Sequence, residues 1–355
     1  MRTKNSATDP TSIAVTAEPA PATTATSATP VAPATPATPA APVAPASVAP
    51  VRQAASARAT LGGTLQAALG VAAFSLTFPA TAWGLESFGP WSLVAVRSVL
   101  AALIAGGCLL AVGVPPRERS RAWGSVPLPA RRHWAGLAVV AAGVVVGFPL
   151  LTTLALQTST TAHAAVVVGL LPLTTALFSA LRVGTRPSRT FWLAALAGAA
   201  AVAAFTVQQS GGALTTADLY LFGALLVCAA GYTEGGRLAR VMPGWQVIGW
   251  ALVLCLPITV PAAAVALSHE AVHLSWHGVT GLLWVAAGSQ FLGLVVWYRG
   301  MAAIGIPKAS QLQLAQPLLT LVWSVLLLGE HLTVAAPLTA AAVLVCIAVT
   351  QRARG

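Results

Sequence analysis

The chain has 355 residues, of which 57% are hydrophobic and only 8% charged, and its mean hydropathy is +0.80. This composition leaves too little polar surface to cover a globule of that size, so it excludes an ordinary water-soluble domain. The net charge of +11 does not indicate a nucleic-acid-binding protein, because the basic residues are nearly all arginines that lie between hydrophobic runs rather than on one polar face.

Residues 1–60 consist mainly of Ala, Pro, Thr, Ser and Val. Such a segment has too little apolar surface to offset its ordering entropy, so we expect a disordered tail. It lacks the basic region followed by an apolar core that defines a signal peptide. A start site further downstream is the alternative, although the next methionine is Met242.

The rest of the chain is a series of apolar runs of the length that crosses a hydrocarbon layer, roughly 20 residues each. In lipid these runs must be helices, because every backbone group needs an internal partner. We therefore expect an all-α integral membrane protein with ten transmembrane helices, at 62–84, 90–113, 134–156, 162–182, 190–209, 218–236, 245–267, 277–298, 307–328 and 333–350.

Basic residues predict how these helices are oriented. If the N-terminus is cytoplasmic, every Lys and Arg except Arg97 falls on the cytoplasmic side, while Glu86, Asp218, Glu270 and Glu330 fall at the outer ends. We expect a multi-pass protein of the bacterial inner membrane with both termini in the cytoplasm.

The two halves of the chain show internal similarity. A shift of 145 residues aligns Pro172 with Pro317 and Gly184 with Gly329. Each half holds five helices, and this odd number predicts that the second half is inverted relative to the first. Inverted repeats are common in transporters that work by alternating access.

Prolines mark the expected helix breaks. Pro172 and Pro317 fall near mid-membrane at 1.5 Å per residue, and each leaves a carbonyl without its helical partner. Each is either an ordinary kink or a break that lines a site. Pro79 and Pro149 complete the set of expected breaks.

Several short motifs recur in the two halves of the chain or stand at helix ends. They are the segment from Gly305 to Ser310, Pro317, the Gly-Glu turn within Leu328–Thr333, Phe78-Pro79, and the segment from Arg97 to Ala101. Together these motifs resemble the EamA-type family of the drug/metabolite transporter superfamily. Thr185 departs from the pattern, because a Glu is frequent there. Ala194 and Thr339 also depart, because a Gly is common at both places.

The resemblance implies two five-helix repeats, at 62–209 and 218–352, around a central cavity lined by helices 1, 3, 4, 6, 8 and 9. It also implies export of amino acids, related metabolites or drugs.

Arg97 is the one basic residue expected within a span, where a charge costs at least about 2.5 kcal/mol and must face protein or water. It either captures a substrate carboxylate or donates hydrogen bonds to carbonyls near Phe78 and Pro79. Glu234 lies near the inner end of its helix, where it either pairs with Arg237 or Arg240 or acts as a protonatable coupling group. Glu330 is the corresponding charge in the Gly-Glu turn.

Gln290 and Gln316 are expected near mid-membrane, where their amides need a partner helix or a ligand. The aromatic residues Phe78, Trp83, Tyr232 and Trp297 could form walls around a substrate, so these six residues join Arg97 as candidate substrate-binding residues.

Other functional classes find little support. No catalytic motif or P-loop is found within the spans, so we expect no enzyme, no cofactor and transport driven by gradients. Metal binding is not expected, although His269, His273 and His277 are spaced four residues apart. Cys108, Cys228, Cys255 and Cys346 lie far apart in apolar stretches, which argues against a disulfide framework.

The sequence thus favours a secondary transporter, most simply an exporter, of small organic molecules within the lipid bilayer. The alternative is a membrane-embedded scaffold or sensor that uses the tail to recruit partners. No nucleic-acid partner is expected, and whether two copies form a homodimer stays open.

Overall fold

The computed structural model describes residues 49–112, 128–183, 188–209, 214–305, 309, 312–313 and 315–352. Contacts divide the chain into two units, Met1–Val48 and Ala49–Gly355, and the second unit holds the helices described below. Expectations for residues 1–48, for the Arg-rich segment 113–127, and for Gly184, Thr185, Lys308 and Ser310 lie outside the described residues.

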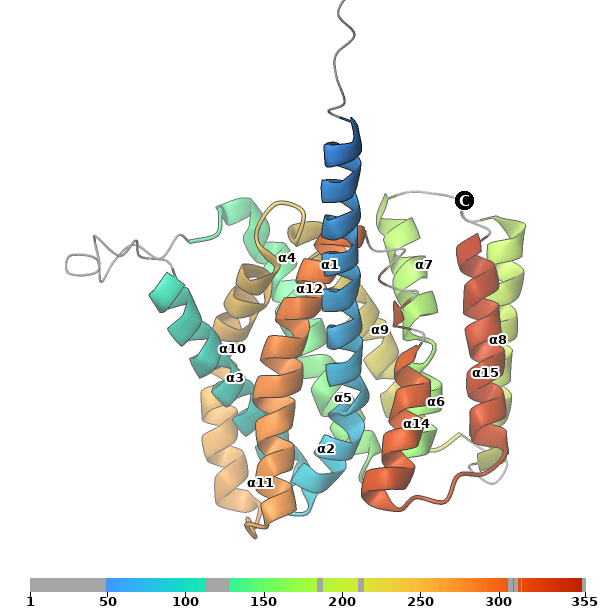
Figure 1. The fold of residues 1–355 in the computed structure, drawn as a ribbon. Coiled ribbons are helices and arrows are strands. Elements are labelled where there is room, and N and C mark those ends of the chain that lie inside the picture. Colours follow the sequence, from blue (N-terminus) through green and yellow to red (C-terminus); the bar gives the residue numbers. More distant parts are fainter. Residues whose placement is uncertain are drawn as a thin grey trace, which may run out of the picture. The chain divides into compact units, whose positions relative to one another are not determined.

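The described part of the chain is all-helical and contains no β-strand (Figure 1). The elements before residue 210 are α1 (Ala49–Ser75), α2 (Thr77–Leu85), α3 (Pro90–Val112), η1 (Arg131–His133), α4 (Trp134–Val140), η2 (Ala141–Gly147), α5 (Phe148–Ala155), α6 (Thr161–Val168), α7 (Leu171–Val183) and α8 (Arg189–Gln209). The later elements are α9 (Thr216–Leu238), α10 (Gly244–His269), α11 (Trp276–Leu283), η3 (Trp284–Gly293), α12 (Leu294–Ile304), α14 (Ala315–Leu328) and α15 (Ala335–Arg352).

Seven helices in the described residues are long and apolar enough to cross a membrane. They are Leu61–Leu85, Pro90–Ala111, Arg131–Ala155, Thr161–Arg182, Thr216–Leu238, Gly244–His269 and Trp276–Ile304. The remaining expected spans, 190–209, 307–328 and 333–350, coincide with three shorter apolar helices, Trp192–Gln208, Ala315–Leu328 and Ala335–Cys346. The membrane-protein class expected from the composition therefore has a structural basis.

The first helix begins earlier than expected. α1 starts at Ala49, within the segment that composition assigns to a disordered tail. Residues 49–60 contain five Ala, two Arg and one Gln, which are strong helix formers. Lack of large apolar side chains argues against a packed core, but it does not prevent a helix from extending beyond one, so the expected tail is too long at its C-terminal end.

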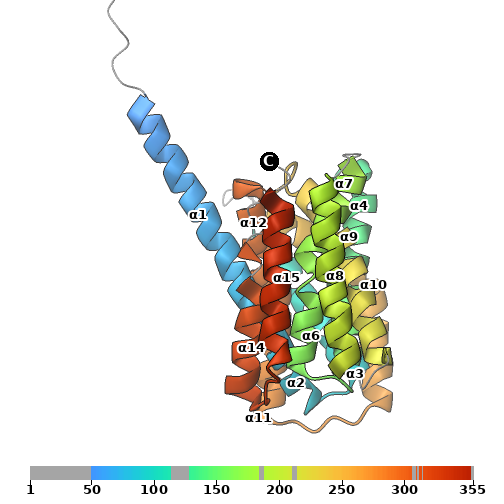
Figure 2. The same ribbon diagram turned by 90° about the vertical axis from the view of Figure 1, so that its right-hand side faces the viewer.

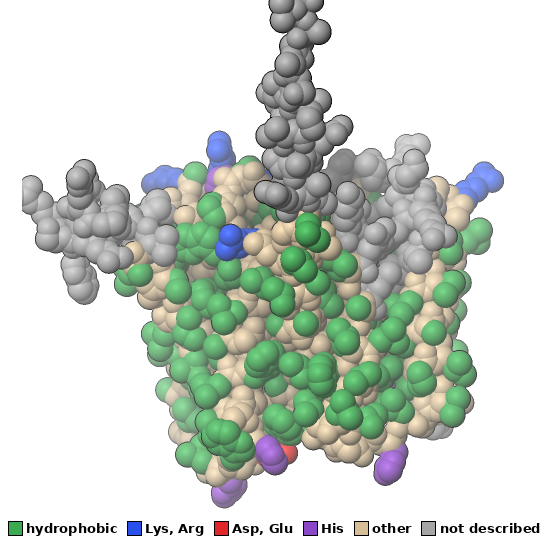
Figure 3. All heavy atoms as spheres, viewed as in Figure 1, with side chains coloured by type: hydrophobic (Ala, Val, Ile, Leu, Met, Phe, Trp, Pro, Cys, Tyr) green, Lys and Arg blue, Asp and Glu red, His purple; other side chains and the backbone are tan. Residues whose placement is uncertain are grey.

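Large apolar side chains cover the sides of the bundle, as in Figure 3. Leu103, Leu193, Ile258, Leu326 and Leu338 are each at least 60% exposed, which would be costly in water and is favourable in lipid. The helix ends that carry Arg131, Arg182, Arg237 and Arg299 lie together and are called the arginine end below. The opposite end, which carries Glu86, Asp218, Glu270 and Glu330, is called the carboxylate end.

Helices distant in sequence pack side by side. α3 packs on α10, α1 on α12, α8 on α15 and α6 on α14 (Figures 1 and 2). α9 contacts α4, η2, α5 and α7, so it lies against the whole third span and part of the fourth. The largest fully buried side chains, Trp297 and Tyr298, belong to α12.

Glycines allow η2 and α9 to approach closely. A Cβ atom on Gly143 would overlap the backbone carbonyl oxygen of Val227 in α9. A Cβ on Gly231 would lie 2.6 Å from Cγ2 of Val144. Because the obstacle at Gly143 is backbone, it cannot be relieved by a side-chain rotation.

We therefore expect Gly143→Ala to destabilise the protein by about 1–3 kcal/mol through overpacking, measured by thermal unfolding in detergent. The matched control is Gly107→Ala in α3, where an added Cβ would meet nothing within 4 Å. That control should leave stability unchanged or raise it by up to about 1 kcal/mol. Equal stability of the two variants would contradict the close approach of η2 and α9.

Candidate functional site

Two π-helices interrupt the bundle at related positions. η2 (Ala141–Gly147) joins α4 to α5, and η3 (Trp284–Gly293) joins α11 to α12. The shift of 145 residues that aligns the two halves places η2 on residues 286–292, inside η3. π-Helical turns change the hydrogen-bonding register of a helix and are frequent at functional sites.

Pro149 explains one polar contact at η2. Proline has no N–H, so Pro149 cannot donate to the carbonyl of Val145 four residues earlier. The Val145 carbonyl instead accepts a hydrogen bond of 3.1 Å from Nε2 of Gln290 in η3. A break expected from the sequence therefore exposes the backbone atom that joins the two π-helices.

Arg97 lies beside this contact. It is 2% exposed, its Nε donates to Oε1 of Gln290 at 2.8 Å, and its Nη2 donates to the carbonyl of Val285 at 3.2 Å. Nε2 of Gln290 also lies 3.3 Å from Oγ of Ser98 in α3. The expected alternative of bonds to carbonyls near Phe78 and Pro79 is wrong in its partner, because the carbonyl that accepts belongs to η3.

A small cavity of about 40 Å³ borders this network. Its polar lining comprises Arg97 and Gln290 together with Thr77, Ser289 and Gln316. Its aromatic lining comprises Phe74, Phe78, Phe148 and Tyr232. The rings of Phe78 and Phe148 stack with centroids 6.4 Å apart, and the hydroxyls of Thr77 and Ser289 are hydrogen-bonded at 2.7 Å.

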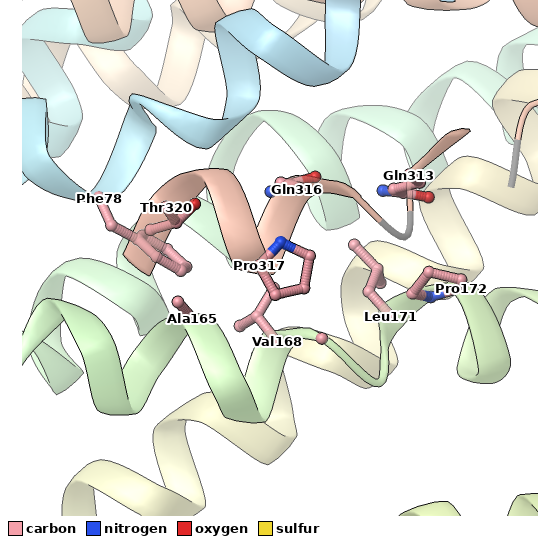
Figure 4. A pocket seen from close by; sticks show the side chains of 10 residues that line it. Phe78, Ala165, Val168, Leu171, Pro172, Gln313, Gln316, Pro317 and Thr320 are labelled. Atoms are coloured by element: carbon pink, nitrogen blue, oxygen red, sulfur yellow. The ribbon is translucent and has the colours of Figure 1, made fainter. Parts of the chain in front are cut away.

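A second void of about 10 Å³ adjoins the first and shares Phe78, Leu171 and Gln316 with it. Figure 4 shows Pro172 and Pro317 beside it, from α7 and α14. Gln313 is 2% exposed there, and its Nε2 has no hydrogen-bond partner among the described residues. Sites for small organic ligands are about 300–1,000 Å³, so both voids are closed relative to a ligand-filled site.

All four expected breaks lie in the first turn of a helical segment. Pro79 belongs to α2, Pro149 to α5, Pro172 to α7 and Pro317 to α14. Where the helix continues through the proline, as from η2 into α5, the missing N–H frees a carbonyl that accepts a hydrogen bond from another helix. Similarly, the Ser75 carbonyl at the turn between α1 and α2 accepts a 2.9 Å hydrogen bond from Thr320 Oγ1 of α14.

Glu234 joins two helices at the arginine end. Its carboxylate accepts 2.7 Å hydrogen bonds from Nε of Arg182 in α7 and from Nε of Arg237 in α9. The Glu234 side chain is 12% exposed, whereas those of Arg182 and Arg237 are 60% and 45% exposed. The pairing with Arg237 matches one expected reading, and the second arginine comes from the other half of the chain.

Two glutamates bridge helices at the carboxylate end. Glu270 accepts from the backbone N–H groups of Trp91 and Ser92 at 3.2 and 2.7 Å. Glu330 accepts from Thr161 and Ala162 at 2.8 and 2.9 Å. Each carboxylate satisfies N–H groups at a helix N-terminus, where negative charge is also favoured by the helix dipole.

The structure brings Phe78, Arg97, Tyr232, Gln290 and Gln316 to one cavity. It does not bring the other two candidate aromatics there. Trp83 stacks on His277 at 5.1 Å near the carboxylate end, and Trp297 packs behind the cavity against Phe74 and Tyr232.

Sequence reasoning missed the smaller polar residues. No sequence pattern pointed to Thr77, Ser289, Gln313 or the aromatic Phe148. Thr and Ser in particular are common within membrane helices, so they do not stand out there. The proximity of Phe148 to Pro149 at an expected break is the one clue that could have found it.

The histidines of the carboxylate end do not form a metal site in the described part of the chain. His277 lies 3.5 Å from Glu86, and no group of three or more metal-binding side chains occurs among the described residues.

A bundle of apolar helices around a buried polar network defines a multi-pass membrane protein. Comparison with known proteins then gives the family. The model of the EamA-like transporter family matches twice, over residues 61–207 and 215–351, so the chain belongs to this family.

Relatives with curated names agree with this assignment. The chain is 42% identical over 298 residues to "Uncharacterized transporter YdeK" of Bacillus subtilis (strain 168), covering 82% of this chain and 98% of that protein. An "Uncharacterized transporter" of Haemophilus influenzae (strain ATCC 51907 / DSM 11121 / KW20 / Rd) is 26% identical over 125 residues, which is 34% of this chain and 74% of that protein. A solved crystal structure at 21% identity has a TM-score of 0.57 and covers 81% of this chain and 97% of its own, which shows a similar fold.

The Gln290 network predicts a graded series of variants. Gln290→Leu removes the acceptor of Arg97 and the donor to Val145, and leaving buried polar groups unpaired costs about 1–3 kcal/mol each. Ser98→Ala removes only the 3.3 Å contact and should cost less than about 1 kcal/mol. Unfolding of both variants in detergent gives the comparison, and a loss for Ser98→Ala as large as that for Gln290→Leu would contradict the central place of Gln290.

Proposed function

We propose that this protein is a secondary transporter that exports amino acids or related small metabolites by alternating access. Its ten spans form two inverted five-helix repeats, with the arginine end in the cytoplasm and both termini there. The observation that carries the proposal is Arg97, a buried cation that borders the central cavity and whose described hydrogen-bond partners, Gln290 and Val285, are neutral.

Helix packing supports the inverted repeat. If span one corresponds to span six and each later span to its equivalent, the pairs α3 with α10, α6 with α14 and α8 with α15 each correspond to themselves. The packing of α1 on α12 corresponds to the packing of α5 on α9. A two-fold relation between the halves requires this pattern of contacts, and the related positions of η2 and η3 agree with it.

The charge distribution supports the orientation. Described arginines other than Arg97 lie at the arginine end, and cytoplasmic loops of bacterial membrane proteins carry an excess of Lys and Arg. The proposed cytoplasmic face is therefore the one where Glu234 pairs with Arg182 and Arg237. The carboxylate end then faces outward.

Arg97 suggests the chemistry of the substrate. A guanidinium buried within a membrane protein is costly without an anion, and a carboxylate is its best geometric partner. The aromatic faces of Phe78, Phe148 and Tyr232 border the same cavity and suit an apolar side chain or, through the ring quadrupole, an ammonium group. An amino acid offers both kinds of group, and in the proposed complex it displaces Gln290 from Arg97.

The closed cavity fits an intermediate of the cycle. About 40 Å³ is too small for an amino acid, so one end of the bundle must open to admit it. The contacts that must break differ between the ends. They are Arg182 with Glu234 at the arginine end, and Glu330 with the N-terminus of α6 at the carboxylate end. Opening one end while the other stays closed is alternating access.

The substrate class is tested by growth of cells with and without the protein on toxic concentrations of single amino acids and of drugs. We expect protection against at least one carboxylate-bearing compound, together with its faster efflux. Deleting residues 1–48, which precede α1, should leave that efflux intact. Loss of function on deleting these residues would favour a scaffold or sensor that recruits partners through the tail.

Arg97→Gln should reduce efflux of that compound by about tenfold to a hundredfold, because a hydrogen bond to a charged group contributes about 1.5–3 kcal/mol. Arg299→Gln at the exposed arginine end is the matched control and should change efflux less than about twofold. Unchanged efflux by Arg97→Gln, with normal membrane insertion, would remove the carboxylate-binding role.

Glu234 is proposed to couple the cycle to protons, because its protonation would release Arg182 and Arg237 and so unlatch the arginine end. Glu234→Gln should abolish efflux driven by a pH gradient while leaving insertion intact, measured in everted vesicles. Glu86→Gln is the control, since its side chain is 47% exposed at the other end. A Glu234→Gln protein that still responds to the gradient would show that the cluster is only structural.

A further inference from the structure

A buried histidine and aspartate meet near the carboxylate end, away from the central cavity. His163 follows the N-terminus of α6, and its Nε2 lies 2.7 Å from Oδ1 of Asp218 in the first turn of α9. The side chains are 9% and 1% exposed. In terms of the two halves, the contact joins the first repeat to the second.

The surroundings hold both side chains in place. Oδ2 of Asp218 accepts hydrogen bonds from the backbone N–H and the hydroxyl of Thr215 at 2.8 and 2.7 Å. The first of these and the bond from the Asp218 backbone N–H to Oγ1 of Thr215, at 3.3 Å, form the capping box of α9. The imidazole of His163 stacks on Phe205 of α8 with centroids 5.4 Å apart. A change in the charge of the imidazole therefore acts directly on the contact between α6, α8 and α9.

A cavity of about 410 Å³ lies next to the imidazole. Its lining includes His163 and Phe205, with Thr158, Thr215, His331 and Thr333. None of its lining residues borders the central cavity, so it is a separate space. A polar space of this size holds many waters, which gives His163 a path for protons.

Few charged groups face His163. α9 contributes Asp218, and the segment between α14 and α15 contributes Glu330 and His331. Glu330 is engaged by the N–H groups of Thr161 and Ala162, and α8 presents Phe205 there. Asp218 is thus the one carboxylate that lies within hydrogen-bonding distance of the imidazole among the described residues.

We propose that His163 and Asp218 form a proton-binding site that latches the outer end of the transporter. A proton from the adjacent cavity adds to the imidazole, and the hydrogen bond between the neutral imidazole and the Asp218 carboxylate becomes an imidazolium–carboxylate ion pair. The opposite charges add a Coulombic attraction at a largely buried contact, so protonation holds α6 and α9 together and loss of the proton weakens their contact. Histidine suits this role because its imidazole ring can carry one proton or two.

The inference rests on the proposed alternating access, and it is tested without any substrate. The four native cysteines are replaced in the full-length protein, and spin labels are attached at Thr158→Cys and Leu219→Cys. Both positions are exposed, Thr158 just before α6 and Leu219 in the first turns of α9, so the labels report the separation of the two helices that the latch joins. The label-to-label distance is measured in phosphatidylethanolamine–phosphatidylglycerol vesicles at about pH 5.5 and pH 8.

At the higher pH the distance distribution should shift to longer values by about 2 Å or more, the size of a helix displacement at an interface. His163→Gln keeps a hydrogen-bond donor for Asp218 but cannot take up a proton, so it should give the same distribution at both pH values. His331→Gln, in the same cavity, should keep the shift.

A pH-dependent shift that survives in His163→Gln, or no shift in the parent protein, would overturn the proposal. The transport proposal fails separately, if Arg97→Gln leaves efflux unchanged or if no carboxylate-bearing compound is exported. If the His163-dependent shift is observed but none of the tested compounds is exported, the latch proposal stands and the proposed substrate class is wrong.

Discussion

The need to satisfy polar groups inside an apolar solvent organises this structure. Water cannot reach a carbonyl within the bilayer, so each backbone group freed by a break must find a protein partner. The amide of Gln290 meets this need at the centre. It accepts a hydrogen bond from Arg97 and donates one to the Val145 carbonyl, to which Pro149 cannot donate because it has no N–H. One side chain thereby ties α3, η2 and η3 together and places a guanidinium at the cavity.

The same constraint separates the ends of the bundle from its centre. At the ends, carboxylates make strong contacts with arginines or with helix N-termini, where partial exposure to water lowers the cost of charge. At the centre, the contacts are amides, hydroxyls and one cation. The centre of the bundle is thus held by a buried hydrogen-bond network, and each end by carboxylate contacts of its own.

Much of this architecture could be predicted from the sequence, because hydrophobic run length and arginine placement depend only on the bilayer. Seven of the expected spans coincide with described helices that are long and apolar enough to cross a membrane, and Pro79, Pro149, Pro172 and Pro317 all lie near segment starts. The site was predictable only for residues that are unusual in lipid, such as Arg97, Gln290 and Gln316. Thr77 and Ser289 were not, since hydroxyls satisfy themselves locally in many helices. Trp83 was misleading, because its large ring suits a binding wall and the interfacial packing on His277 equally well.

The position of the prolines has a mechanical consequence. A continuous helix that bends in its middle must break backbone hydrogen bonds. A helix that bends at a proline loses no such bond there, because proline has no N–H. α2, α5, α7 and α14 each begin beside such a proline. These helices can tilt as rigid units about the prolines, so that movement at one end of the bundle leaves the backbone at the other end undisturbed.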